Sequence, residues 1–202
     1  MKAVRNSRGF TLIEIMVVLL IMGGVLAIGG TRLFNPSENR RGQIRQLAIQ
    51  AKELRTYARL RNSTYRLAIA MDDKGGHRYW VESASGHVLQ LSETQEEELA
   101  KLTEIQREDA IRGRAKFEKE KKPGDVKLTT GLKFEGVEIA GRSKEFTSGI
   151  AYIHFFPQGL SEEALIKIGD GNTHHWTIAI HPLTGVAEIL SRQTTLKELK
   201  SQ

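Results

Sequence analysis

Glu14 is the only charged side chain between Phe10 and Thr31, within an otherwise apolar run. About 22 residues in a helix span roughly 33 Å, which is enough to cross the hydrocarbon core of a bilayer. A carboxylate in lipid costs about 2.5–3.5 kcal/mol on insertion scales, so it needs a partner or a function. The chemistry that it offers is ion pairing with a cation. The sequence therefore predicts a membrane helix over residues 10–34 with an acid near its start.

A second set of candidate residues consists of His154, His174, His175 and His181. A metal site would need several of these side chains together. An extended chain sends the adjacent His174 and His175 to opposite faces of a sheet, so at most one of them can join His181. The sequence has no cysteine and no G-x-S-x-G or H-E-x-x-H arrangement. We therefore expect no enzyme, no metal site and no cofactor.

A short basic segment precedes the apolar run and contains Lys2, Arg5 and Arg8. By the positive-inside rule this segment favours a cytoplasmic N-terminus. An ordinary secretory signal has its small-residue cleavage site after the apolar stretch. Here the small residue, Gly9, comes before that stretch. Cleavage at Gly9 would remove the charges and keep the apolar helix, which is the opposite of ordinary secretion.

The stretch RGFTLIEIMVVLLIM, residues 8–22, resembles the N-terminus of the type IV pilin and type II secretion pseudopilin superfamily. The resemblance implies that residues 1–9 are a leader, that prepilin peptidase cuts after Gly9, and that Phe10 becomes the N-methylated first residue. It also implies that Glu14 pairs with the Phe10 amine of a neighbouring filament subunit. Glu14 would also lie one helical turn from its own new α-ammonium, near the positive end of the helix dipole. The alternative is a Glu14 that reaches water at the bilayer surface.

The rest of the chain, residues 35–202, is expected to form a periplasmic pilin-like domain of the α+β class. Apolar residues recur at steps of three and four after Pro36, which predicts an amphipathic helix. Its apolar stripe comprises Ile44, Leu47, Ala48, Ala51, Leu54, Tyr57 and Ala58, and its solvated basic face comprises Arg45, Lys52, Arg55 and Arg59. Later runs of alternating apolar residues predict an antiparallel β-sheet system, beginning with a hairpin over residues 64–83. The long N-terminal helix, membrane half plus amphipathic half, is expected to pack on this sheet system.

Residues 92–124 differ from the rest of the predicted domain. They are rich in helix formers, with acidic residues early, basic residues late, and only a weak stripe of Leu99, Leu102 and Ile105. We expect a charged, exposed insertion that is helical or partly disordered. Its basic end, from Arg112 to Lys122, is interpreted as a solvated charge run rather than a site for a polyanion.

The C-terminal stretch over residues 153–189 resembles the H-type minor pseudopilins, also called GspH/FimT-like. The matching residues are Phe155, Pro157 and Gly159 of an F-x-P-x-G turn, and Thr184 and Gly185 of a final hairpin. This resemblance implies a low-copy structural subunit at or near the tip of a type II secretion pseudopilus, which supports export of folded proteins across the outer membrane. The implied partners are other major and minor pseudopilins, prepilin peptidase and inner-membrane lipid.

Nucleic acid is not expected as a partner, although the formal net charge is +6. The leader supplies +3 of this charge through Lys2, Arg5 and Arg8, so about half of the excess is left after processing. The alternative function is that of a minor type IV pilin, FimT-like, in pilus assembly or DNA uptake. Candidate contacts to DNA are then Arg192, Lys197 and Lys200, although a solvated tail is the simpler interpretation of these residues.

Overall fold

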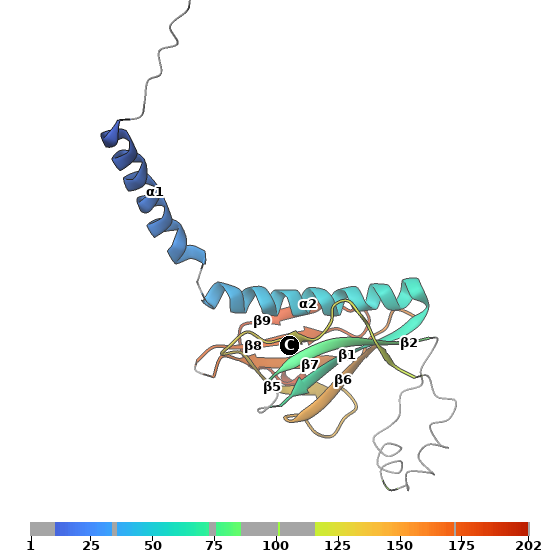
Figure 1. Ribbon diagram of the computed structural model, residues 1–202. Coiled ribbons are helices and arrows are strands. Elements are labelled where there is room, and N and C mark those ends of the chain that lie inside the picture. The colour runs from blue at the N-terminus through green and yellow to red at the C-terminus, as the bar shows by residue number, and fades with distance from the viewer. Residues whose placement is uncertain are drawn as a thin grey trace, which may run out of the picture. The chain divides into compact units, whose positions relative to one another are not determined.

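The computed structural model describes residues 11–33, 36–72, 76–85, 101, 116–171 and 173–201. The side chains of residues 25–38 lie outside this description. The chain divides into two compact units, Met1–Asn39 and Arg40–Gln202, and each is described by itself. The first unit holds α1, Leu12–Leu33 (Figure 1).

The core of the second unit is built on α2, Pro36–Arg61, which belongs to this unit from Arg40 onward. The helix begins at Pro36, because the fixed backbone angle of proline suits the first helical position. Its predicted apolar stripe is confirmed by the burial of Ile44, Leu47, Ala48, Ala51, Leu54 and Ala58. The assignment of Tyr57 to the buried stripe is wrong, because this side chain is 41% exposed. Asn62, with a φ of 47°, follows the last helical residue and turns the chain into the first strand.

The first sheet, called sheet A, has the strand order β3-β2-β1-β6, and β4 also pairs with β2. Its strands are β1 (Ser63–Met71), β2 (Arg78–Ser85), β3 (Glu118–Lys119), β4 (Val126–Lys127) and β6 (Gly149–Phe155). All pairs are antiparallel. The predicted hairpin is confirmed by the pairing of β1 with β2, in which Leu67 lies opposite Val81.

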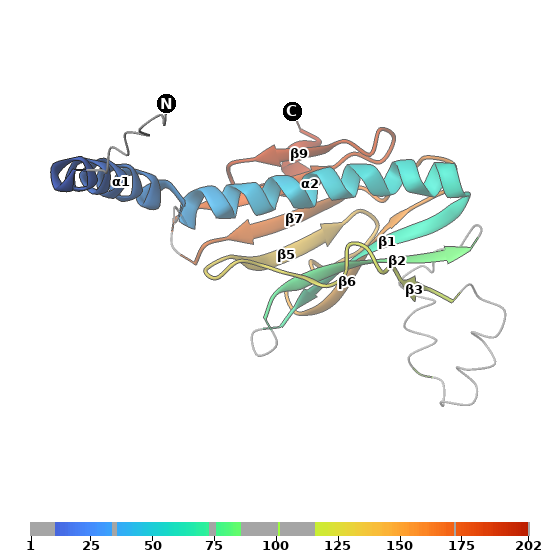
Figure 2. The ribbon, with the colours of Figure 1, turned by 45° about the horizontal axis from the view of Figure 1, so that its top comes forward.

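The second sheet, called sheet B, has the order β5-β7-β8-β9 and is also antiparallel. Its strands are β5 (Lys133–Ile139), β7 (Ala164–Gly169), β8 (His175–Ile180) and β9 (Ala187–Leu190). A single helical turn, α5 (Leu196–Leu199), follows β9. Figure 2 shows α2 lying along both sheets.

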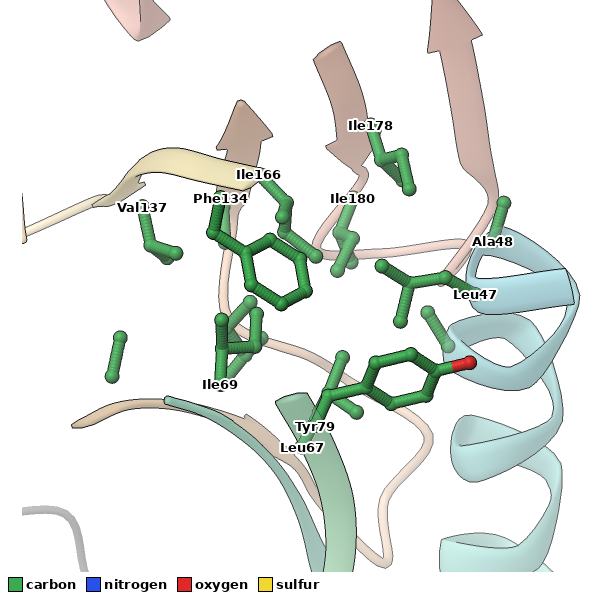
Figure 3. Packing of buried hydrophobic residues seen from close by; sticks show 14 of the residues in the cluster. Leu47, Ala48, Leu67, Ile69, Tyr79, Phe134, Val137, Ile166, Ile178 and Ile180 are labelled. Carbon is green, nitrogen blue, oxygen red and sulfur yellow. The ribbon is translucent and has the colours of Figure 1, made fainter. Parts of the chain in front are cut away.

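One main core lies between α2 and the inner faces of the two sheets. Figure 3 shows Leu47 of α2 facing Tyr79 of sheet A and Ile180 of sheet B across this core. These three side chains are at most 2% exposed. The predicted α+β class, a helix packed on antiparallel sheets, is therefore confirmed.

The predicted insertion differs from its expected form at its C-terminal end. Residues 92–100 and 102–115 lie outside the described residues. The prediction of a helix or a disordered segment is wrong for Glu118 and Lys119. These two residues form β3 and pair with Ser83 and Glu82 of β2, respectively. Next to them, the Phe117 ring lies 3.9 Å from the guanidinium carbon of Arg66. Here the hydrogen bonds to the edge of β2 and this cation–π contact outweigh the local helix propensity.

Candidate functional site

Glu14 lies in the first turn of α1, three residues after Thr11, which caps the helix. The Glu14 amide donates to the Thr11 carbonyl at 3.1 Å and to the Thr11 hydroxyl at 3.3 Å. A threonine followed three residues later by glutamate is the pattern of a capping box, which satisfies amides that the first helical turn leaves unpaired. The Glu14 side chain is exposed. Gly9 and Phe10, the predicted processing residues, lie outside the described residues.

The apolar side chains around Glu14 are exposed on every side of α1. The large ones between Leu12 and Met22 are each at least 51% exposed, and they occupy every helical position except that of Glu14. A helix that is apolar all round is normally covered by other apolar material. Among the described residues, no helix combines the length and the hydropathy that a membrane span requires.

The C-terminal motif residues lie on two turns that one arginine of α2 joins. Arg55 donates through Nε to the carbonyl oxygen of Gly159 at 2.6 Å and through Nη2 to that of Leu183 at 2.9 Å. The first turn is that of the F-x-P-x-G motif and the second precedes Gly185. The assignment of Arg55 to a solvated face is therefore wrong, because its guanidinium binds main-chain oxygens of both turns.

The two motif glycines are required by the conformation of these turns. Gly159 has a φ of 84° and Gly185 a φ of 61°, which L-residues rarely adopt. A Cβ atom on Gly159 would lie 2.6 Å from Cδ of Arg59, and one on Gly185 would collide with the Arg55 side chain. The sequence predicts the motif glycines, but it does not predict that Arg55 and Arg59 lie against their turns. The only sequence signal for this placement is that Arg55 and Arg59 are four residues apart, which puts them on the same face of the helix.

The four histidines lie at separate places, each beside its own carboxylate. The pairs are His154 with Glu162 at 2.8 Å, His174 with Asp170 at 3.0 Å, His175 with Glu135 at 2.9 Å and His181 with Glu188 at 3.7 Å. Over the described part of the chain, no group of three or more His, Asp or Glu side chains is arranged to hold a metal ion.

The C-terminal residues do not form the solvated tail that the sequence suggested. In α5 the Thr195 hydroxyl accepts from the Glu198 amide at 3.3 Å, and the Glu198 carboxylate accepts from the Thr195 amide at 3.1 Å. Leu196 is buried against Leu165 and Ala179 on the outer face of sheet B. The three candidate DNA contacts, Arg192, Lys197 and Lys200, are all exposed, and Lys200 also forms an ion pair with Glu163 at 2.8 Å.

A hollow of about 590 Å³ lies between α2 and residues 120–123. Charges of both signs line it, including Arg61, Lys121 and Lys122 as well as Glu53 and Glu120. At its edge Arg61 donates to the Tyr65 hydroxyl at 2.9 Å. Burial raises the pKa of Tyr65, an effect that this hydrogen bond opposes, while the same bond raises the pKa of Arg61. The mixed charges do not define one class of ligand.

Comparison with known proteins gives one family match and two similar structures. Residues 4–30 match the prokaryotic N-terminal methylation motif, which confirms the motif recognised in the sequence. No curated protein matches the chain. Two structures of the minor pseudopilin EpsH from the type II secretion system of Vibrio cholerae are similar, with 11% and 12% sequence identity and TM-scores of 0.42 and 0.45. The similarity covers 76% and 78% of this chain and 97% of each EpsH chain.

Proposed function

We propose that this chain is a minor pseudopilin, a structural subunit of a type II secretion pseudopilus rather than an enzyme. The observation that carries the proposal is the methylation motif over residues 4–30, which includes most of α1 and its apolar side chains, exposed on every side from Leu12 to Met22. The H-type assignment is further supported by the Phe155-x-Pro157-x-Gly159 turn and the Thr184–Gly185 turn, which Arg55 links.

In this function the N-terminal residues convert a membrane anchor into a filament subunit. Prepilin peptidase removes residues 1–9, cutting after Gly9, and Phe10 is N-methylated. α1 then holds the chain in the inner membrane, with the N-terminus on the cytoplasmic side and residues 35–202 in the periplasm. Glu14 pairs with the amine of Phe10 in a neighbouring subunit, since an acid in lipid needs a cationic partner.

The subunit lies at or near the tip of the pseudopilus and supports export of folded proteins across the outer membrane. Its partners are the other major and minor pseudopilins, prepilin peptidase and inner-membrane lipid. The same methylation motif fits a minor type IV pilin in pilus assembly or DNA uptake, which is the second candidate function. Exposed Arg192 and Lys197 are the residues that such a function would use.

Mass spectrometry of the chain produced together with a prepilin peptidase tests the processing step. We expect a mature N-terminus at an N-methylated Phe10. Gly9→Val should block the cut, whereas Gly42→Ala, at a position with no atom within 4 Å of the added Cβ, should leave it unchanged. A wild-type chain that retains Met1 beside an active peptidase would refute the proposal.

Binding to duplex DNA separates the two candidate functions. The body, residues 36–202, suits this measurement because its core is formed by residues from Ile44 onward. Micromolar affinity with a steep salt dependence supports DNA uptake, because each phosphate contact releases counterions. No binding at low salt favours secretion.

A further inference from the structure

A second hollow lies beside the first turns of α2, where the helix passes over β8 and β9 (Figure 1). Its volume is about 330 Å³. Arg41 and Arg45, one helical turn apart, line it together with the apolar side chains of Ile44, Trp176 and Ile189 and with Ser191. All of these residues belong to the second compact unit. The hollow thus combines two guanidinium groups with apolar walls.

The charge at the rim of this hollow is positive. Arg41 and Arg45 are exposed, and among the described residues neither has a carboxylate within 4.0 Å. Asp170, a nearby acid, already binds Arg40 at 3.4 Å and His174 at 3.0 Å. A ligand with a negative charge therefore complements the site, and two planar guanidinium groups suit a phosphate.

The tryptophan in the wall argues against a nucleic acid base as the ligand. Trp176 is 9% exposed, and the His174 ring stacks on it with centroids 5.9 Å apart and an angle of 14° between the planes. A base would need an open aromatic face on which to stack. The hollow instead offers apolar side chains beside two cations, which suits a phosphate attached to an apolar group.

The position of the hollow in the chain points to the source of that phosphate. Arg41 follows Leu33, the last residue of α1, by eight residues. Eight extended residues reach at most about 29 Å. If α1 lies in the membrane, the two arginines are therefore tethered near the headgroup layer, where basic side chains and tryptophan are typically found.

We propose that this hollow binds the phosphate headgroup of an anionic phospholipid in the membrane that holds α1. Arg41 and Arg45 bind the phosphate oxygens, and Trp176 and Ile189 contact the apolar part of the lipid next to the headgroup. The site would orient the body against the membrane before the subunit enters a filament. This inference rests on the proposed function, because it requires α1 to be a membrane anchor.

The test uses the full chain labelled with 5-fluorotryptophan, in micelles of an uncharged detergent. The chain has two tryptophans, Trp80 and Trp176, so each gives one fluorine resonance, assigned with Trp176→Phe. Titration with dihexanoyl phosphatidylglycerol should shift the Trp176 resonance saturably and leave that of Trp80 in place. Dihexanoyl phosphatidylcholine and inorganic phosphate, at equal concentrations, should produce no saturable shift.

The double variant Arg41→Gln/Arg45→Gln should bind phosphatidylglycerol about 30-fold more weakly, which corresponds to about 2 kcal/mol. Lys52→Gln/Lys144→Gln removes two charges from exposed positions outside the hollow and should change the affinity less than threefold. Four results would each overturn the site. The first two are a Trp176 resonance that responds equally to both lipids, or equally to phosphatidylglycerol and inorganic phosphate. The others are a Trp176 shift with duplex DNA instead of lipid, and an Arg41→Gln/Arg45→Gln variant with unchanged affinity for phosphatidylglycerol.

A parallel sedimentation measurement separates this site from the anchor. The full chain and the Arg41→Gln/Arg45→Gln variant should both stay with phosphatidylcholine vesicles after an alkaline carbonate wash, because α1 alone holds them. If the chain stays with the vesicles but Trp176 does not respond to phosphatidylglycerol, only the headgroup site fails. If the wild-type chain washes off, the anchor of the proposed function fails, and the headgroup site fails with it.

Discussion

The two long helices of this protein follow one another in the chain but distribute their apolar side chains in opposite ways. α2, with 26 residues, collects them in one stripe that is buried against two sheets. α1, with 22 residues, exposes them at every large apolar position from Leu12 to Met22. The core of the body is therefore completed by α2, whereas the apolar side chains of α1 from Leu12 to Met22 are exposed.

Charged side chains show the same division of roles. On α2 three arginines serve the fold: Arg40 binds Asp170, Arg55 binds two turn carbonyls and Arg61 binds Tyr65. On the described part of α1 the one charged side chain is Glu14, and it is exposed. These three charges on α2 thus stabilise the body, whereas the charge on α1 serves assembly only under the proposed function.

The largest expected effect comes from replacing Glu14. Glu14→Leu should abolish incorporation into filaments while membrane insertion stays intact, because the cationic N-terminus of a neighbour loses its partner. The measurement compares the variant in the membrane fraction and in sheared filaments.

Glu14→Gln distinguishes ion pairing from helix capping. Glutamine also fits the third helical position of a capping box, so a pure capping role predicts normal incorporation. The pairing role predicts that Glu14→Gln fails like Glu14→Leu. Glu53→Gln, at an exposed position of α2, is the control for loss of one negative charge and should assemble normally.

The second prediction compares the same substitution on both helices. Leu47 is fully buried on α2. Leu47→Ala should lower the free energy of unfolding by about 2–5 kcal/mol, because it leaves a cavity in the core. Leu20 is 77% exposed on α1. Leu20→Ala should change the free energy of unfolding of the body by less than about 0.5 kcal/mol. Urea denaturation in detergent, followed by tryptophan fluorescence, measures both. Similar losses for both variants would contradict the division of roles between α1 and α2.

Features that depend only on residues close together in the chain could be predicted from the sequence. The stripe from Ile44 to Ala58 follows from helical periodicity, and the β1–β2 hairpin follows from alternation around a glycine-containing turn. The N-terminal motif was also recognisable, because its order and spacing are local. Tyr57 was assigned wrongly since periodicity places a residue on a helix face but does not say how wide the covering sheet is.

Features formed by residues far apart in the chain were not predictable. Arg40 and Asp170 are 130 positions apart, and Arg55 and Gly159 are 104 positions apart. A helical arginine has the same local pattern whether it meets water or a turn carbonyl, so Arg55 was assigned to the solvated face. The end of the predicted insertion joined sheet A for a related reason: the edge of β2 that it pairs with is distant in sequence.

The third prediction concerns the pH dependence of the body alone. Burial raises the pKa of Tyr79 to about 12 in the core under α2. A tyrosine in the unfolded chain ionises near pH 10, so the contribution of Tyr79 to stability is complete below pH 10 and is lost as the pH rises toward 12. The expected loss is about 2–3 kcal/mol of unfolding free energy.

Tyr79→Phe isolates this effect from the titration of other groups. The variant should lose less stability than the wild type between pH 10 and pH 12, as measured by urea denaturation at each pH. At pH 8 it should be no less stable, because the Tyr79 hydroxyl has no hydrogen-bond partner among the described residues. Parallel loss in both proteins would show that folding does not raise the pKa of Tyr79.

The smallest expected effect tests whether the arginines of α2 act within the fold. Gly159 and Gly141 have nearly the same φ, 84° and 82°, but an added Cβ would meet Arg59 only at Gly159. Gly141→Ala should therefore cost about 1–2 kcal/mol from backbone strain alone. Gly159→Ala should cost about 1 kcal/mol more, because Cδ of Arg59 lies 2.6 Å from the new atom. In an Arg59→Ala background that extra cost should vanish, and a double-mutant cycle by urea denaturation measures it. Equal costs for the two glycines in the wild-type background would mean that Arg59 moves aside into solvent and does not constrain the turn at Gly159.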